Sequence, residues 1–220
     1  MIELPTAPVA IDSVNPGMLV LYGQSKIGKT TMLSQLDNCL MIDTEKGTKY
    51  VEGLKVQVNN LGDLKEVLEA LRTSEHKYKY IAIDTIDKIS EWADAHTCAS
   101  NGVATIGDLE FGKGYSISRE LTLKILDNFQ TLTEHLIIIG HRKRTIIGDT
   151  SLEVKTSSLD LTGKLRGQLM SKADAIGYVY RNDGKLMISF VPSDEVECGG
   201  RCAHLRGKDM EFDWNGIYLD

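Results

Sequence analysis

Residues 18–30, MLVLYGQSKIGKT, contain the feature that most limits how this chain can fold. Positions 23 to 30 follow the spacing G-x-x-x-x-G-K-T, after a short apolar run and before a predicted helix. Two glycines allow a tight turn with inward-pointing backbone N–H groups, and the N-terminus of the following helix favours an anion. The stretch therefore predicts a phosphate-binding loop between a buried strand and a helix.

The residue types in this loop predict how it holds a nucleoside triphosphate. We expect Lys29 to reach the β- and γ-phosphates, and to be exposed when no nucleotide is bound, while the Thr30 hydroxyl binds Mg²⁺. The predicted cofactors are ATP and Mg²⁺, and GTP fits the same pattern. The predicted nucleotide-binding residues are Gly23, Gln24, Ser25, Lys26, Ile27, Gly28, Lys29, Thr30 and Thr31.

A magnesium site of this kind needs a carboxylate at the end of a neighbouring apolar strand. Two runs end that way: LMIDTE, with Asp43 and Glu45, and YIAIDT, with Asp84. We assign Asp84 to the metal, through a bound water, because its strand has the fuller hydrophobic run. The alternative is that Asp84 caps the helix that begins at Ile86, a role that Thr85 can also fill.

Glu45 lies just past a predicted strand end, where catalytic residues of open α/β sheets gather. A carboxylate there can orient and deprotonate the attacking water. Glu45 is therefore the candidate catalytic base, and the alternative is a solvated surface glutamate.

Apolar runs alternate with amphipathic segments along the chain, and the runs are apolar throughout. This pattern predicts an α/β fold with a mainly parallel sheet covered on both faces, closed by an antiparallel hairpin around Asp183-Gly184. The polar, aperiodic stretches 99–116 and 142–160 are expected to be loops. The expected strands are 18–22, 39–43, 80–84 and 136–140, and the expected helices are 30–36, 61–72, one from residue 86, 118–133 and 163–172.

Charge and hydropathy limit the classes of function. The net charge of −6 argues against a protein that coats nucleic acid over its whole surface, although residues 141–174 carry seven Lys/Arg against four Asp/Glu. No apolar run approaches the roughly 18 residues that a membrane-spanning helix needs, and the first residues do not form a secretory signal. We expect one cytoplasmic domain, residues 1–220, with no membrane partner.

The stretches YGQSKIGKTT, MIDTEKGT, YIAIDTID and IIIGHRKR resemble, in this order, the RecA-like ATPase core. In particular, they resemble the short phage nucleotide-binding proteins of single-strand annealing and recombination systems, over residues 14–212. The resemblance implies a P-loop NTPase fold and places the catalytic glutamate of RecA-type recombinases at Glu45. It also implies that His141 senses the γ-phosphate, the alternative being a histidine that caps a strand end.

The same resemblance implies single-stranded DNA as a partner. The stretch 142–160 would be one DNA-binding loop and 102–114 the other, the alternative for the basic run being a solvated loop. The first loop has little aromatic content, so base stacking is not visible in the sequence. The DNA-binding residues that the resemblance implies are Arg142, Lys143, Arg144 and Lys155.

RecA-like ATPases often complete their site with a basic residue from the neighbouring subunit. Arg201, in the late stretch ECGGRCAH, is the candidate for that role, with Arg206 and Lys208 as second choices and solvated surface charges as the alternative. A cation supplied on assembly would stabilise the charge of the transferring phosphoryl group. The implied assembly is a homo-oligomer, a ring or a filament, and a single-strand-binding protein is a further candidate partner.

These observations predict an Mg-ATP-hydrolysing, DNA-stimulated ATPase that acts with single-stranded DNA in phage recombination or annealing. Two other classes also fit a P-loop. One is a nucleotide or small-molecule kinase, and the other is a DNA-independent, ATP-driven loader or interaction module.

Overall fold

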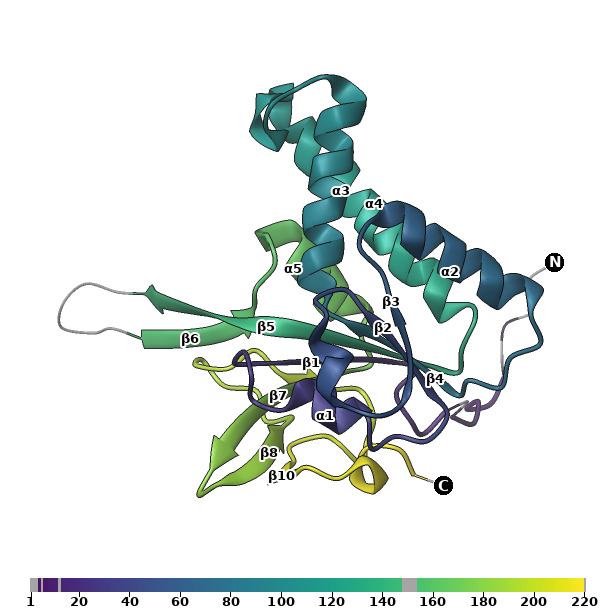
Figure 1. Ribbon diagram of the computed structural model, residues 1–220. Helices are drawn as coiled ribbons and strands as arrows, with labels where there is room; N and C mark the ends of the chain where they lie inside the picture. The colour runs from purple at the N-terminus through teal and green to yellow at the C-terminus, as the bar shows by residue number, and fades with distance from the viewer. Residues whose placement is uncertain (1–3, 5, 12, 148–153, 220) are drawn as a thin grey trace.

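The computed structural model describes residues 4, 6–11, 13–147 and 154–219, and among these the side chains of all but residues 146, 147, 154 and 155. Its centre is a twisted sheet with the strand order β10-β8-β7-β1-β5-β4-β2-β3, in which β6 also pairs with β5 and β9 with β7 (Figure 1). The strands are β1 Met18–Gly23, β2 Cys39–Asp43, β3 Leu54–Gln57, β4 Tyr80–Asp84, β5 His135–Ile147, β6 Val154–Leu159, β7 Ala175–Asn182, β8 Lys185–Ser189, β9 Gly199–Gly200 and β10 Asp209–Glu211.

The helices pack on the two faces of this sheet. None of those in the described residues is long and apolar enough to cross a membrane. The α-helices are α1 Lys29–Leu33, α2 Leu61–Thr73, α3 Ile86–Asn101, α4 Lys113–Gln130 and α5 Gly163–Lys172, and short 3₁₀ turns lie at Gly47–Tyr50, Ile106–Asp108, Glu110–Gly112 and Trp214–Gly216.

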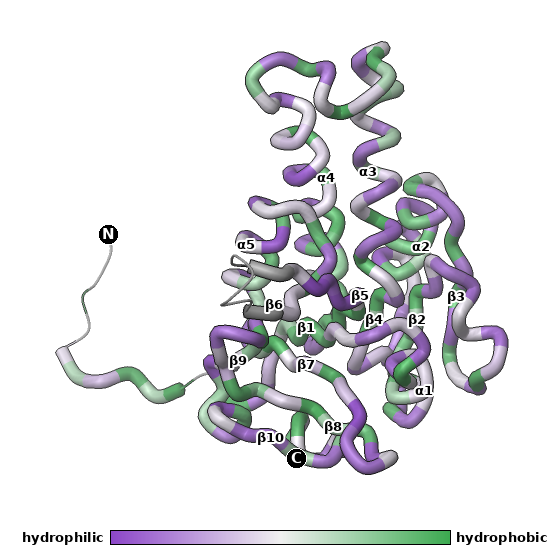
Figure 2. Tube along the Cα trace, turned by 90° about the vertical axis from the view of Figure 1, so that its left-hand side faces the viewer, coloured by the Kyte–Doolittle hydropathy of each residue, from purple (hydrophilic) through white to green (hydrophobic). Residues whose placement is uncertain are grey.

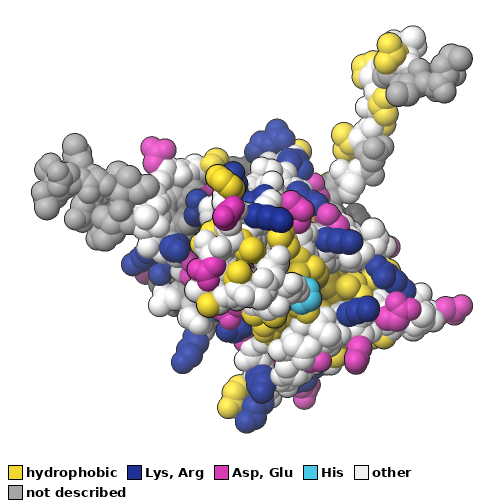
Figure 3. All heavy atoms as spheres, turned by 90° about the horizontal axis from the view of Figure 1, so that it is seen from above, with side chains coloured by type: hydrophobic (Ala, Val, Ile, Leu, Met, Phe, Trp, Pro, Cys, Tyr) yellow, Lys and Arg dark blue, Asp and Glu magenta, His cyan; other side chains and the backbone are white. Residues whose placement is uncertain are grey.

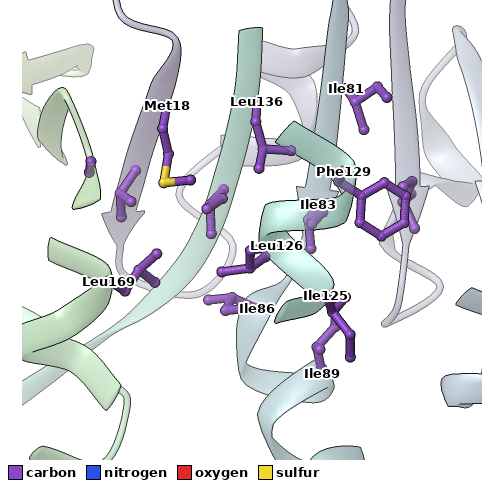
Figure 4. Packing of buried hydrophobic residues seen from close by; sticks show 14 of the residues in the cluster. Met18, Ile81, Ile83, Ile86, Ile89, Ile125, Leu126, Phe129, Leu136 and Leu169 are labelled. Carbon is purple, nitrogen blue, oxygen red and sulfur yellow. The ribbon is translucent and has the colours of Figure 1, made fainter. Parts of the chain in front are cut away.

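Two hydrophobic cores form because the central strands are apolar on both faces. Side chains such as Ile81, Ile83 and Leu136 face α2 to α5 (Figure 4). Neighbouring strand residues point the other way and pack against α1 and the C-terminal segment that carries Trp214. Figure 2 shows hydrophobic colours along the inner parts of the central strands and a mixture of polar and hydrophobic colours along the helices. The strands are therefore fixed by burial on both sides.

The fold class expected from the sequence is confirmed. Strands β1, β2, β4, β5 and β7 run parallel, and β7 and β8 form the C-terminal antiparallel hairpin. The expected strand and helix positions are also correct for the most apolar segments. The short strands β3 and β10 were not expected, because they are mainly exposed and have no apolar run.

The expectation that 142–160 is a loop is wrong for most of that stretch. Strand β5 continues to Ile147 and pairs antiparallel with β6, from Arg142 opposite Leu159 to Ile147 opposite Val154. The two strands extend from the body as an arm (Figure 1). The arm forms because backbone pairing does not need a hydrophobic period, and β-branched residues such as Thr145 and Thr156 favour it. The tip, 148–153, lies outside the described residues.

The stretch 99–116 is also more ordered than a loop. Helix α3 continues to Asn101 and α4 begins at Lys113, with two 3₁₀ turns between them. The two helices project from the body as a helical hairpin (Figure 1). Phe111, with its side chain fully exposed and φ at 54°, lies between the helices.

The two glycines of the loop after β1 are needed for different reasons. Gly28 has φ of 118°, a conformation that strains any residue with a Cβ. Gly23 has no such angle, but a Cβ there would lie 2.4 Å from the carbonyl oxygen of Val179 on β7. Gly23 is therefore a glycine because two strands approach closely, and not because the chain turns there.

We predict that Gly23→Ala lowers the free energy of unfolding by about 1–3 kcal/mol, since the carbonyl at Val179 belongs to a sheet that cannot move aside. The matched control is Gly167→Ala on α5, where a Cβ meets nothing within 4 Å. It should raise stability by roughly 0.5–1 kcal/mol, because alanine favours a helix interior. Urea denaturation of both variants measures the difference, and an unchanged midpoint for Gly23→Ala would contradict the prediction.

Candidate functional site

The polar residues of the candidate site lie together because four parallel strands end at the same edge of the sheet. The strand register places Gly23 of β1 opposite His141 of β5, and Asp84 of β4 opposite Asp43 of β2. A cleft of about 350 Å³ opens at this edge. Its lining consists of Ser25, Lys26, Gly28, Lys29, Thr30, Thr31, Glu45, Gly47, Asp84, Thr85 and His141.

The predicted phosphate-binding loop has the expected setting, between a buried strand and the N-terminus of α1. The expectation that Lys29 is exposed without nucleotide is wrong. Only 6% of Lys29 is exposed, and its ammonium donates to the carbonyl oxygens of Gly23 (3.0 Å) and Gln24 (2.9 Å). Burial lowers the pKa of Lys29, while the nearby Asp84 opposes that shift. These two carbonyl oxygens thus bind the Lys29 ammonium, which was expected from the sequence to bind a phosphate.

The proposed metal ligands Thr30 and Asp84 are in direct contact. The Thr30 hydroxyl donates to a carboxylate oxygen of Asp84 over 2.6 Å. Burial raises the pKa of Asp84, and the hydrogen bond from Thr30 and the charge of Lys29 reduce that shift. A hydroxyl and a buried carboxylate are hard oxygen donors of the kind that Mg²⁺ takes, and a cation would favour the ionised carboxylate. The residues present therefore fit the ion.

Asp43, the other strand-end aspartate, has a different role. Its carboxylate accepts hydrogen bonds from the backbone N–H groups of Glu45, Gly47 and Thr48, and from the Thr48 hydroxyl, over 2.6 to 3.1 Å. Burial opposes ionisation, but these hydrogen bonds outweigh it and lower the pKa of Asp43. Asp43 organises the turn after β2 and leaves Asp84 as the carboxylate that faces Thr30.

Glu45 projects from that turn toward the ends of β4 and β5. Its carboxylate accepts a hydrogen bond from the Thr85 hydroxyl (3.0 Å) and lies 3.8 Å from Nε2 of His141. The Thr85 N–H donates to the Thr44 hydroxyl (2.7 Å), which in turn donates to the Thr85 carbonyl (3.1 Å). The candidate base is thus held between Thr85 and His141, and its catalytic role stays a prediction.

The His141 ring lies between two carboxylates. Its Nδ1 is 3.3 Å from a carboxylate oxygen of Asp87, which also accepts a hydrogen bond from the His141 N–H (3.2 Å). The hydrogen bond to Asp87 raises the pKa of His141, desolvation opposes this, and Glu45 adds to the rise. Asp87 was not identified from the sequence as a site residue. The one sequence feature that pointed to it is its position in the first turn of α3, directly after the strand that ends at Asp84.

Arg201 lies away from the cleft of its own chain. It follows β9, which pairs with Ala175 and Ile176 at the start of β7, about 13 Å along the sheet from the end that carries the loop. Its guanidinium contacts the carbonyl oxygens of Ser171 and Lys172 and, at 3.5 Å, the Asp174 carboxylate. Action at the site of a neighbouring subunit stays a prediction.

The predicted DNA-binding residues divide between the two faces of the arm. Side chains alternate along a strand, so Arg142 and Arg144 share one face and Lys143 points to the other. Arg142 donates to the Tyr178 hydroxyl (2.9 Å), whereas the Lys143 ammonium lies 3.4 Å from a carboxylate oxygen of Asp160. Lys155 pairs with Ile146 in the ladder, and its side chain lies outside the described residues.

Comparison with known proteins agrees with this geometry at the level of family. The AAA domain family matches residues 15–202. The chain belongs to the AAA domain family. The matched range of this AAA-type P-loop domain contains the loop at Gly23–Thr30, the strand ending at Asp84 and the described part of the β5–β6 arm.

One curated relative is the SPbeta prophage-derived uncharacterized protein YorG of Bacillus subtilis (strain 168), 25% identical over 115 residues. The match covers 50% of this chain and 36% of that protein, so the chain spans only about a third of its relative's length.

Two solved structures are similar at low identity. The flagellar accessory protein FlaH of Methanocaldococcus jannaschii is 14% identical, with a TM-score of 0.41 and coverage of 80% of this chain and 77% of that one. A KaiC-like protein of Pyrococcus horikoshii OT3 is 14% identical, with a TM-score of 0.47 and coverage of 92% and 88%.

The raised pKa of His141 predicts a pH-dependent stability. The interaction of protonated His141 with Asp87 and Glu45 is fully present below the unfolded pKa of about 6.5 and is lost as pH rises through the higher folded value. The stability difference between wild type and His141→Gln should therefore be larger near pH 5.5 than near pH 8.5.

Urea denaturation at both pH values measures this difference. In an Asp87→Asn background the pH dependence of the difference should shrink, because the main hydrogen-bond acceptor of His141 has lost its charge. A difference that grows with pH would contradict the assignment.

Proposed function

We propose that this AAA-type P-loop domain is an Mg-ATP-hydrolysing protein that acts with single-stranded DNA in phage recombination or annealing. The observation that carries the proposal is the path of strand β5. One strand runs through the core, places His141 in the cleft beside Glu45, and continues without a break into the arm that carries Arg142 and Arg144. A ligand on the arm would therefore act directly on the strand that borders the site of hydrolysis.

In the proposed reaction, the residues of the cleft have separate tasks. The backbone N–H groups of the loop and Lys29 bind the phosphates, once the ammonium turns from the carbonyls of Gly23 and Gln24. Thr30 and Asp84 would hold Mg²⁺, which supplies charge neutralisation at the β- and γ-phosphates. Glu45 orients the attacking water and accepts its proton, and His141 donates a hydrogen bond toward the γ-phosphate.

The surface charge supports a local DNA site rather than a broad one. Figure 3 shows acidic and basic side chains interspersed on the face that it displays. With a net charge of −6, binding to a phosphate backbone depends on a limited set of cations such as those on the arm. The setting in a phage is supported by the similarity to a prophage-derived protein over half of the chain.

The two other classes remain alternatives with their own signatures. A kinase would transfer the γ-phosphate to a nucleoside or nucleotide rather than to water. A loader or interaction module would hydrolyse ATP at a rate that responds to a protein and not to DNA.

We predict that Glu45→Gln binds ATP but hydrolyses it about 100-fold more slowly or worse, the usual scale for loss of a general base. The glutamine keeps the size and the hydrogen bond to Thr85, so the cleft should stay intact. Glu52→Gln, an exposed glutamate outside the cleft, is the matched control and should turn over normally. Steady-state phosphate release together with ATP binding separates the two effects, and wild-type turnover in Glu45→Gln would place the base elsewhere.

We also predict that an oligo(dT) strand raises the ATPase rate of the wild-type protein. The rate with ATP and Mg²⁺, with and without the oligonucleotide, is the test. A rate indifferent to DNA, or phosphate transfer to an added nucleoside, would overturn the proposal in favour of a loader or a kinase respectively.

A further inference from the structure

A second cavity, of about 480 Å³, lies on the other side of the loop from the cleft. The two hollows share only Ser25 and Lys26 of their described lining. Five of the second cavity's side chains come from β5 and β7 and have no task in the proposed hydrolysis, and the other four belong to the predicted phosphate-binding loop. Its lining consists of Gln24, Ser25, Lys26, Ile27, Arg142, Arg144, Tyr178, Tyr180 and Arg181.

One wall of this cavity is a pair of parallel aromatic rings. Tyr178 and Tyr180 occupy alternate positions on β7, and their rings lie 5.7 Å apart with 11° between their planes. Arg142 donates to the hydroxyl of Tyr178, whose ring also contacts Tyr22 of the core at 5.4 Å. The hydroxyl of Tyr180 donates to the Asp209 carboxylate over 2.7 and 2.9 Å. Both rings are held in place before any ligand arrives.

The other walls are cationic. Arg181 donates to the carbonyl oxygens of Ile27 and Gly184, which keeps its guanidinium beside the loop. Arg142 is half-buried against Tyr178, and Arg144 is exposed at the rim. The lining described above holds three guanidinium groups and no carboxylate. Flat aromatic faces beside arginines recognise a base joined to a phosphate, through stacking and charge-assisted hydrogen bonds.

We propose that this cavity binds one nucleotide unit of single-stranded DNA, with its base against the tyrosine pair and the phosphates on either side of its sugar on Arg142 and Arg144. This inference rests on the proposed function and names the site through which DNA would act. In this site, Tyr178 and Tyr180 of β7 provide the surface for base stacking that the arm lacks. The same chemistry also fits the adenine of bound ATP, but the arm that continues from the cavity favours a chain that extends beyond one nucleotide, so we assign the site to DNA.

The test measures binding of a fluorescent oligo(dT) by anisotropy to wild type, Tyr180→Leu and Tyr180→Phe. Leucine removes the ring and should weaken binding about fivefold or more, whereas phenylalanine keeps the ring, loses only the bond to Asp209, and should bind like wild type. An oligomer of abasic deoxyribose phosphates should bind wild type and Tyr180→Leu alike. Thermal melting checks that the variants are folded.

Arg144 and Lys143 form a matched pair on opposite faces of the arm. Arg144→Ala should reduce the slope of log affinity against log salt by about 0.7, as expected for one lost single-strand phosphate contact, and Lys143→Ala should change it less. Equal slopes in the two variants would argue against the cavity.

The outcomes separate the inference from the proposed function. If wild type does not bind the oligonucleotide at all, the proposed function fails. If wild type binds it and folded Tyr180→Leu binds equally well, only the cavity assignment fails. A loss of affinity for a fluorescent ATP analogue in Tyr180→Leu, with or without a loss of DNA binding, would assign the ring to the adenine and overturn the proposal.

Discussion

The parallel pairing of β5 between β1 and β4 is the interaction on which the site depends. Each ladder bond fixes which residues face each other at the strand ends, so Gly23 meets His141 while Asp84 lies level with Ile139. A slip of one residue would turn every side chain of a strand to the opposite face of the sheet. Burial of β5 on both faces prevents such a slip. The hydrophobic core therefore sets the geometry of the polar cleft.

The sequence was sufficient to predict the central parallel strands and the loop after β1, for a physical reason. Strands buried on both faces are apolar throughout, and the spacing of Gly23, Gly28 and Thr30 matches a known phosphate-binding pattern. The strand ends follow from the same runs, which is why Glu45 and Asp84 could be placed at one edge. Local composition determines these features, and they need no knowledge of distant contacts.

Other features depend on contacts that a linear pattern does not contain. Backbone pairing between residues 142–147 and 154–159 holds the arm together. The polar side chains of these strands show no regular hydrophobic pattern from which the pairing could be predicted. The buried Lys29 ammonium donates hydrogen bonds to two nearby carbonyl oxygens, and Asp87 contacts a histidine 54 positions away. Tyr178 and Tyr180, which lie beside Arg142, belong to a strand far along the chain. The basic segment has few aromatic residues in its own sequence, but the fold brings these two next to it.

The pair of hydrogen bonds between Thr44 and Thr85 joins the ends of β2 and β4 directly next to Glu45 and Asp84. Since Glu45 also accepts a hydrogen bond from the Thr85 hydroxyl, its carboxylate is tied to the joined ends of these two strands. In the proposed reaction, the sheet would therefore fix the position of Glu45 relative to Asp84, the residue that would help to hold Mg²⁺. Glu45 and Asp84 would then need little rearrangement when ATP arrives. The Lys29 ammonium, in contrast, would have to turn from the two carbonyl oxygens that it contacts. In the proposed function, a ligand on the arm would influence the cleft through His141, because strand β5 carries both the arm and this cleft residue.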